Sequence, residues 1–337
     1  MTHPRLSLAL SAADALPASG RILVIGGVPG LSDLPKERTL VVQGFRPDHD
    51  ALVALGWTVV PEPDAVTGNH AAAVLLLPRS RAAARASVAE AARRVAGGGP
   101  IWIDGQKTDG IDTMLRDIRA RTTVSTPVVK AHGKIFRFDA GAMFDDWRAD
   151  DLHPVPGFVT RAGVFSAEKV DPGSVLLAEA LPERMPPRVV DLGAGWGWLA
   201  AQILARQGVS EVHLIEADHL ALACARRNVG DPRARFHWAD ATRFRPVPPV
   251  DAVVMNPPFH AGRTTDPALG AAFIKAAAGM LAPAGRLWMV ANRHLPYEAV
   301  LARHFREVAA IGGSGAFKLF TAAHPLASSV RSPRPSA

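Results

Sequence analysis

The chain has 337 residues, 48% of them hydrophobic, with a formal net charge of +7 and an isoelectric point of about 10.1. These totals predict a globular protein with room for two domains. The single cysteine, Cys224, excludes an intrachain disulfide, and no apolar run approaches the roughly 18 residues of a membrane span. The positive charge favours a polyanionic partner. We expect a monomeric, cytoplasmic protein that contacts no membrane.

In the first half, short apolar runs alternate with a helical pattern. Strands are expected at residues 21–27, 40–42, 57–60, 73–77 and 101–105, a helix at 79–95, and a β-hairpin at 128–138. This alternation predicts an α/β layer structure with a mostly parallel sheet. The glycine-rich residues 26–30 resemble a nucleotide-binding loop. Pro29 interrupts the helix start, however, and no acidic residue ends the next strand, so we interpret this stretch as a structural turn.

A change of pattern at residues 139–157 marks the expected domain boundary, because this stretch is rich in proline and charge and has weak periodicity. The expected domains are residues 1–150 and 151–327. The tail at 328–337 consists largely of Ser, Pro and Arg, and we expect it to be disordered.

The strongest local signal of the second half lies at residues 188–200. A predicted strand contains Asp191, and the turn after it has Gly193, Gly195 and Gly197 at alternate positions before a helical pattern begins. Glycine allows positive φ and lets a ligand approach the backbone closely. The start of the helix offers free N–H groups. Taken alone, such a turn fits any mononucleotide-type site.

Three further predicted strands end in polar residues, namely Glu216, Asp240 and Asn256. Counted from Asp191, these residues follow one another at spacings of 25, 24 and 16. The carboxyl ends of parallel strands share one edge of a sheet, where such folds bind ligands. Glu216 could accept both hydroxyls of a ribose, and Asp240 could receive an adenine amino group. The sequence therefore predicts a nucleoside-binding edge.

The last of these strands runs into Asn256-Pro257-Pro258-Phe259. The prolines lack backbone N–H groups and fix φ, and Pro257 disfavours a helical conformation at Asn256. The result is a stiff turn that presents the Asn256 side-chain oxygen, the Pro257 carbonyl and the Phe259 ring. Two acceptors beside a flat ring suit a planar group that carries an NH₂. Asn-Pro-Pro is also an ordinary loop breaker.

Together these motifs resemble those of class I S-adenosylmethionine-dependent methyltransferases, and in particular the bacterial ribosomal RNA guanine-N2 methyltransferases. That closer resemblance also runs through residues 163–166, Asp171, 173–174, His260, Gly262, 291–292, 295–297 and 317–318. It implies two tandem Rossmann-like methyltransferase domains with mostly parallel sheets, of which the N-terminal one is degenerate, and an antiparallel C-terminal hairpin. It implies S-adenosylmethionine as cofactor and no metal.

The resemblance also assigns site residues. Those implied to bind the cofactor are Phe165, Asp191, Gly193, Gly195, Gly197, Glu216, Asp240 and Asn256. Those implied to be catalytic are Asn256, Pro257, Pro258 and Phe259. His260, Arg263 and Lys318 are candidates for substrate contact. The bulky Trp196 and Trp198 in the glycine turn depart from the family pattern and put the shape of the cofactor pocket in question.

The implied activity is methylation of the exocyclic N2 amine of a guanine in ribosomal RNA, with 16S RNA of the small subunit expected. The partner would be ribosomal RNA or a ribosomal subunit. Two alternatives stay open. One is an N6-adenine or protein-glutamine N-methyltransferase, which would use the same acceptor pair. The other is a non-catalytic RNA-binding assembly factor. The N-terminal domain would serve RNA recognition or support folding.

Overall fold

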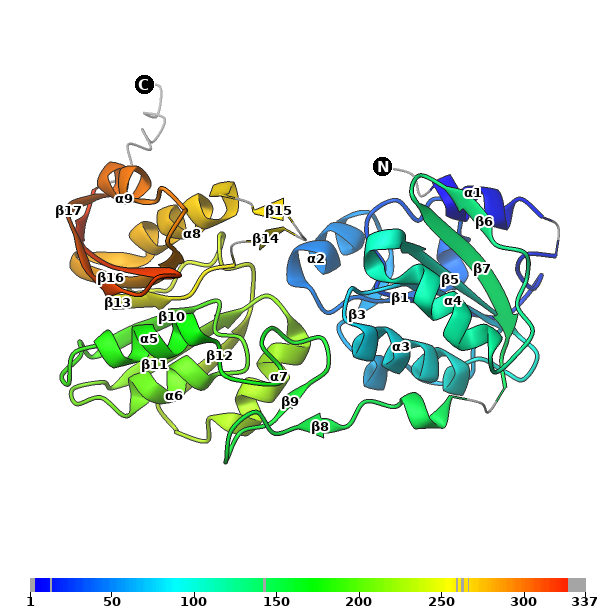
Figure 1. The fold of residues 1–337 in the computed structure, drawn as a ribbon, viewed down its shortest axis with the longest axis horizontal. Coiled ribbons are helices and arrows are strands. Elements are labelled where there is room, and N and C mark those ends of the chain that lie inside the picture. The colour runs from blue at the N-terminus through cyan, green and yellow to red at the C-terminus, as the bar shows by residue number, and fades with distance from the viewer. Residues whose placement is uncertain are drawn as a thin grey trace, which may run out of the picture. The chain divides into compact units, whose positions relative to one another are not determined.

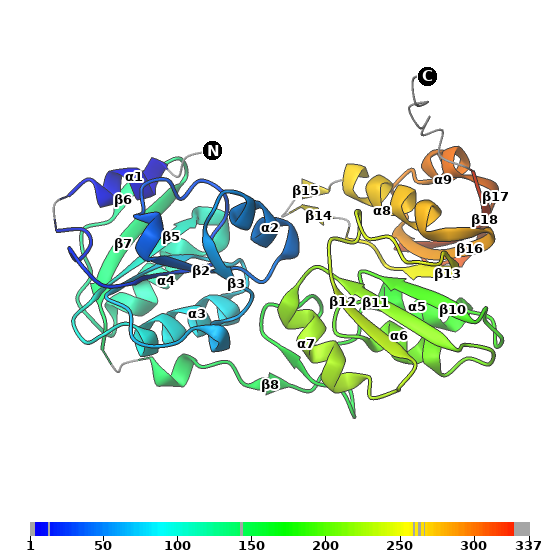
Figure 2. The same cartoon turned by 180° about the vertical axis from the view of Figure 1, so that it is seen from behind.

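The computed structural model describes residues 4–12, 14–141, 144–258, 260–261, 264–265 and 267–326. The chain forms two compact units. Unit 1 comprises Met1–His153, Thr160–Ala167 and Asp218–Leu220, and unit 2 comprises Pro154–Val159, Glu168–Ala217 and the chain from Ala221 onward. Figures 1 and 2 show the ribbon from opposite sides. The tail at 328–337, expected to be disordered, lies outside the described residues.

Unit 1 contains a seven-stranded sheet in the order β3-β2-β1-β4-β5-β7-β6. Its strands are β1 (Ile22–Ile25), β2 (Thr39–Val42), β3 (Thr58–Val60), β4 (Ala72–Leu76), β5 (Pro100–Gln106), β6 (Val128–Lys130) and β7 (Gly133–Asp139). Its α-helices are α1 (Pro4–Leu10), α2 (Arg46–Ala54), α3 (Arg81–Arg94) and α4 (Ile111–Arg119). The 3₁₀ helices are η1 (Lys36–Arg38), η2 (Pro63–Ala65), η3 (Lys107–Asp109) and η4 (Asp145–Trp147), and β8 (Asp151–Leu152) pairs with β9 (Thr160–Arg161).

Unit 2 contains a second seven-stranded sheet, in the order β12-β11-β10-β13-β16-β18-β17. Its strands are β10 (Arg188–Leu192), β11 (Glu211–Glu216), β12 (Ala234–Trp238), β13 (Val250–Met255), β16 (Leu281–Asn292), β17 (Phe305–Gly313) and β18 (Phe317–Pro325). The helices are α5 (Pro172–Ala180), α6 (Trp198–Leu204), α7 (His219–Asn228), α8 (Pro267–Met280) and α9 (Glu298–His304). A small ribbon pairs β14 (His260–Ala261) with β15 (Thr264–Thr265).

The two sheets share one topology. In each, five strands pair in parallel, and the last two added at one edge are antiparallel. The prediction of two tandem α/β domains with mostly parallel sheets and an antiparallel C-terminal hairpin is confirmed. Residues 26–30 lie in the connection between β1 and β2, where the described chain contains the 3₁₀ helix η1 and no α-helix.

Each sheet of the two units is covered by apolar clusters on both faces. In unit 2, alternate residues of β10 point to opposite faces: Val189 packs with α5, α6 and α7, and Val190 packs with α8 and α9. Strands buried on both sides in this way read as continuous apolar runs. Burial on both faces fixes the register of the strands, and therefore fixes where their carboxyl ends lie.

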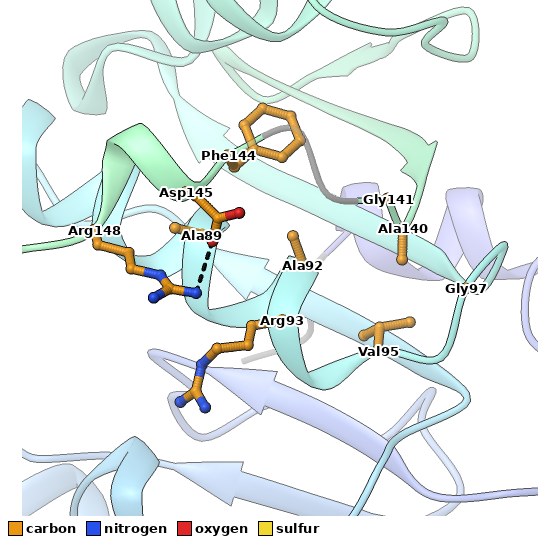
Figure 3. Close-up of a pocket in the computed structure, with 10 residues that line it drawn as sticks. All are labelled: Ala89, Ala92, Arg93, Val95, Gly97, Ala140, Gly141, Phe144, Asp145 and Arg148. Atoms are coloured by element: carbon orange, nitrogen blue, oxygen red, sulfur yellow. Dashed lines mark ion pairs between the residues drawn. The ribbon is translucent and has the colours of Figure 1, made fainter.

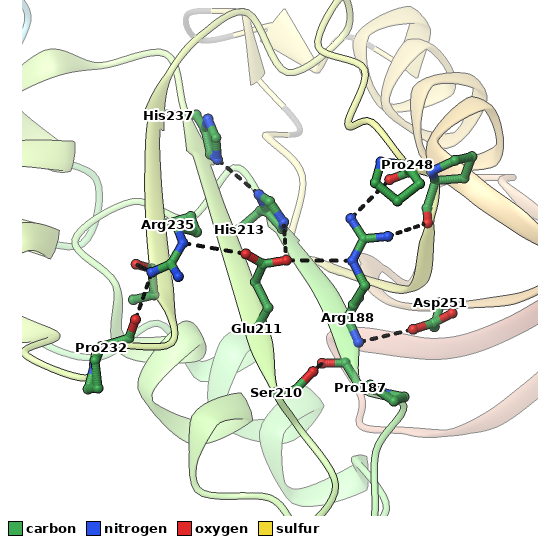
Figure 4. A network of polar contacts seen from close by, with 12 residues as sticks. Pro187, Arg188, Ser210, Glu211, His213, Pro232, Arg235, His237, Pro248 and Asp251 are labelled. Carbon is green, nitrogen blue, oxygen red and sulfur yellow. Dashed lines mark hydrogen bonds and ion pairs between the residues drawn. The ribbon is translucent and has the colours of Figure 1, made fainter.

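A polar network joins the first three strands of unit 2 near their amino ends (Figure 4). The Glu211 carboxylate lies 3.2 Å from Nε2 of His213, 3.5 Å from Nε of Arg188 and 3.4 Å from Nε of Arg235. Burial raises the pKa of Glu211, but His213 and Arg188 outweigh it and lower the pKa below its usual value. Nδ1 of His213 lies 3.0 Å from Nε2 of His237 on β12. The network thus fastens the end of the sheet opposite the predicted site.

A buried ion pair fastens the N-terminal helix of unit 1. Arg5 of α1 donates from Nε to Oδ1 of Asp104 at 2.5 Å and from Nη2 to Oδ2 at 3.2 Å. Both side chains are almost fully buried. Nη1 of Arg5 also donates to the carbonyls of Lys130 and Ala131, so a single guanidinium joins α1, β5 and the β6–β7 turn.

We expect Arg5→Ala to lower the free energy of unfolding of unit 1 by about 3–5 kcal/mol, because it leaves the Asp104 carboxylate buried without its cation. Urea denaturation followed by circular dichroism measures this loss. Arg148→Ala is the control, since its ion pair with Asp145 is solvent-exposed and should contribute under about 1 kcal/mol. Equal, small effects of the two substitutions would contradict the prediction.

Candidate active site of unit 2

The turn between β10 and α6 is built by its glycines. Gly193, Gly195 and Gly197 have φ of 81°, 55° and 85°, a region that side chains disfavour. A Cβ added at Gly197 would press on Ala225 and Val229, so this glycine allows α6 to pack against α7. A Cβ added at Gly195 would meet no heavy atom of the described residues within 4 Å. The turn is therefore open at Gly195 and closed at Gly197.

The two tryptophans of this turn pack into unit 2. Trp196 is buried, with its ring 5.6 Å from that of Phe158, and its carbonyl accepts from the Asn228 side chain. Trp198 begins α6 and packs, half-buried, against the core. Core packing thus accounts for both indoles.

The acidic residues of β10 and β11 meet at this turn. Glu216, the last residue of β11, accepts the Gly195 backbone N–H through Oε2 at 2.7 Å. Asp191 is fully buried, and its Oδ2 has no hydrogen-bond partner among the described residues. Burial, together with the nearby negative charge of Glu216, raises the pKa of Asp191 to about 8. A buried, unsatisfied carboxyl group at a turn is typical of a site that awaits a polar ligand.

Asp240 lies two residues beyond β12 rather than at its last residue. Its Oδ1 accepts from the backbone N–H of Thr242 at 2.8 Å and from the Thr242 hydroxyl at 2.6 Å. This closed turn keeps the half-buried Asp240 side chain close to the carboxyl end of the strand.

Asn256 follows β13 directly and is held by two residues at the start of α5. Its Nδ2 donates to Oδ2 of Asp171 at 2.7 Å and to Oγ of Ser174 at 2.9 Å. Both amide hydrogens are thus engaged. The same Oδ2 accepts the Ser174 backbone N–H, so Asp171 also caps α5, with Pro172 in its first turn.

Of the remaining candidates, the structure describes some and not others. Pro257 is buried and Pro258 is exposed, while Phe259 and Arg263 lie outside the described residues, as does the side chain of His260.

The structure also describes the two candidates Lys318 and Phe165. Lys318 of β18 forms an ion pair of 2.5 Å with Glu298 and lowers the pKa of that carboxyl group. Phe165 belongs to unit 1, whereas the other candidate cofactor residues belong to unit 2, and its ring is 68% exposed.

A cavity of about 370 Å³ lies in unit 1 and not among these residues (Figure 3). Ala89, Ala92 and Val95 line it, with Arg93 and Arg148 at its rim. Val95 bridges to His70, just before β4, so the cavity lies near the amino end of that strand. It therefore does not correspond to a ligand site at carboxyl ends.

The strand pairing brings the motif residues of unit 2 to one edge. Asp191 pairs with Leu214 on one side and Val254 on the other, which places it near both Glu216 and Asn256. The described residues contain no cluster of three or more His, Cys, Asp or Glu side chains suited to a metal. They also contain no helix long and apolar enough to cross a membrane. The edge offers carboxylates, open backbone and an oriented amide.

Comparison with known proteins identifies the family. Residues 156–321 match the methyltransferase small domain. Ribosomal RNA small subunit methyltransferase C of Hahella chejuensis is 30% identical over 233 residues, covering 66% of this chain and 68% of the relative. Ribosomal RNA large subunit methyltransferase G of Aeromonas salmonicida is 33% identical over 167 residues, covering 48% of this chain and 44% of the relative.

Among solved structures, a T. thermophilus 16S rRNA N2 methyltransferase in complex with AdoMet and guanosine matches with a TM-score of 0.78 and 26% identity. The match covers 95% of this chain and 91% of that one, so it extends over both units. On the shared sequence, topology and strand-end motifs, this chain belongs to the ribosomal RNA small subunit methyltransferase C family.

Proposed function

We propose that this protein transfers a methyl group from S-adenosylmethionine to the exocyclic N2 amine of a guanine in 16S ribosomal RNA. The observation that carries the proposal is the fixed amide of Asn256, which directly follows β13 and begins the Asn-Pro-Pro-Phe motif. The match over both units to a 16S rRNA N2 methyltransferase with bound guanosine supports guanine over adenine or a protein glutamine.

The residues of the edge fit the cofactor. Gly195 leaves its side of the turn open, Asp191 has a buried oxygen without a partner, and Glu216 lies beside Gly195. These residues, with Gly193, Gly197 and Asp240, would hold S-adenosylmethionine, which supplies an electrophilic methyl group. Phe165 is proposed to add an exposed aromatic ring.

The acceptor amine is a poor nucleophile because its lone pair is delocalised into the guanine ring. The Asn256 Oδ1 and the Pro257 carbonyl would each accept one of its N–H groups. These bonds turn the lone pair out of the ring plane and favour the tetrahedral nitrogen of the transition state. No strong base is required, since the amine acidifies as it is alkylated. Fixed orientation of the two reactants adds to the rate.

The target base must be unpaired or flipped out of its helix to reach this edge. Phe259 would stack on it, an interaction of about 1–3 kcal/mol. Pro258 would stiffen the turn between Asn256 and Phe259. His260, Arg263 and Lys318 are proposed to contact the RNA. The protein would act as a monomer in the cytoplasm, on ribosomal RNA or an assembled subunit.

Unit 1 is proposed to be a methyltransferase domain that has lost its cofactor site. After β2 it has Gln43 instead of an acid, and the Gln43 amide donates to the Gly27 carbonyl in the turn after β1 at 2.6 Å. After β4 it has Leu77-Pro78, which offers no side-chain acceptor. Unit 1 thus keeps the sheet topology of unit 2 but lacks the side chains that would bind a cofactor. This combination fits a domain that supports RNA recognition or folding.

The carboxyl edge of that sheet carries cations suited to RNA. Lys107 follows β5, while Lys130 and His132 form the β6–β7 turn, and all three are exposed. Within the described chain, neither lysine forms an ion pair. Ala131 and His132 both have positive φ, at 48° and 56°. The Arg5 guanidinium stabilises the turn by donating to the carbonyls of Lys130 and Ala131. Turns with strained backbone that the surrounding structure holds in place often occur at binding sites. Here the proposed ligand is RNA phosphate.

For the acceptor role, we expect Asn256→Ala to lower kcat by about 100- to 1,000-fold, the usual effect of removing one group that stabilises a transition state. Cofactor affinity should change less than about twofold. Methyl transfer to 16S RNA, read by nucleoside mass spectrometry, and calorimetry with S-adenosylmethionine measure the two quantities. Methylguanosine that forms equally in the wild type and Asn256→Ala would refute the assignment.

For the cofactor site, we expect Asp191→Asn to remove a pH dependence of stability. The raised pKa means that the folded wild type keeps a proton that the unfolded chain releases, so its stability falls as pH rises from about 4 towards 8. In thermal melts without cofactor, the melting temperature of the variant should rise relative to that of the wild type as the pH increases across this range. Calorimetry should show weaker cofactor binding by the variant. Parallel melting curves at every pH would contradict this.

For unit 1, we expect the double substitution Lys107→Ala, Lys130→Ala to weaken RNA binding and to lower its salt slope by about 2. Binding of a 16S RNA fragment across a salt series measures both. Arg116→Ala, Arg119→Ala is the charge-matched control, because these residues lie in the last turn of α4, which begins at the carboxyl edge and runs away from it. Equal losses in the two variants would argue for non-specific attraction.

A further inference from the structure

The start of α5 holds more polar contacts than a helix cap requires. Oδ2 of Asp171 accepts the Ser174 backbone N–H at 2.9 Å, which is the ordinary capping bond. The same oxygen also accepts from the Asn256 amide, whose other hydrogen goes to the Ser174 hydroxyl. Asp171 and Asn256 are 85 residues apart in sequence. A cap alone would not need this second bond.

These bonds choose between the two orientations of the Asn256 amide. In the observed orientation, the NH₂ faces Asp171 and Ser174, so Oδ1 points away from them. Rotating the amide by half a turn would place Oδ1 against the Asp171 carboxylate and break both bonds. A carboxylate can only accept hydrogen bonds, so it excludes the rotated form. Asn256 is thereby restricted to presenting an acceptor.

The glycine in the first turn of α5 lies close to this contact. Helix propensity would favour alanine over Gly173 by about 0.5–1 kcal/mol, and its φ is not in the positive range. A Cβ there, however, would lie 3.0 Å from Oδ2 of Asp171 and 3.2 Å from the ring of Phe317. A methyl group at this position would therefore lie in tight contact with both the Phe317 ring of β18 and the carboxylate, and these neighbours would have to shift to accept it.

We propose that Asp171 and Ser174 are positioning residues that hold Asn256 with its Oδ1 directed at the substrate amine. This inference rests on the proposed function, because it assigns a task to the amide that accepts the guanine N–H. It predicts that turnover depends on the side-chain bond to Asn256 and not on the helix cap.

Two substitutions at one position separate the two roles. Asp171→Ser keeps a good N-cap, but its side chain is too short to cap the helix and also reach Asn256. Asp171→Asn keeps an oxygen that can accept both bonds. We expect Asp171→Ser to lower kcat by about 10- to 100-fold with near-normal melting temperature and cofactor affinity. Asp171→Asn should stay within about fivefold of the wild type.

Ser174→Ala should give an intermediate loss in kcat, since one of the two bonds remains. Ser80→Ala is the matched control for a lost cap, because Ser80 caps α3 in unit 1 by accepting the Ala83 N–H. It should lower the melting temperature and leave kcat unchanged.

The outcomes are distinct. Absence of methyl transfer by the wild type would sink the proposed function itself. Wild-type turnover with an equally active Asp171→Ser would overturn the positioning role alone. Equal loss in Asp171→Ser and Asp171→Asn would also overturn it, because the charge and not the hydrogen bonds would then control the rate.

Discussion

The parallel pairing of β10 with β11 and β13 is the constraint on which the rest of the site depends. It brings three strand ends to one edge, and the burial of both sheet faces prevents any slip of register. As a consequence, Asp191 is buried with an oxygen that has no hydrogen-bond partner in the described part of the chain. Such a group destabilises the fold without ligand, and its retention at the centre of the sheet is a physical argument for function.

The sequence predicts this edge well because its signals are local. Apolar runs on a doubly covered sheet are continuous, so their ends are easily located, and the alternate glycines after Asp191 mark the turn. The contact between Asp171 and Asn256 could not be predicted in this way. From sequence, Asp171 before Pro172 indicates only a helix start, since the second bond depends on how α5 packs beside β13.

The helices of unit 1 were harder to predict, for related reasons. The regions of α1, α2 and α4 give short patterns of 7, 9 and 9 residues, which lie near the limit of what periodicity can distinguish from loops. Their stability comes from tertiary contacts. For α1 the decisive contact is the ion pair of Arg5 with Asp104, a residue 99 positions away. In the sequence, both residues look like ordinary surface charges.

The two units share one sheet topology but differ in the polar groups at the carboxyl edge of the sheet. In unit 2 the polar groups of the carboxyl edge are left open towards a ligand: Asp191 keeps an unsatisfied oxygen, and the Asn256 amide is anchored on one side only. In unit 1 the corresponding region closes on itself, because Gln43 bonds to the turn after β1 and Arg5 neutralises the buried Asp104. Closure removes the need for a cofactor to complete the fold of unit 1. At the rim of the same edge, Lys107 and Lys130 are exposed to solvent, and the proposed role of unit 1 in RNA binding rests on them.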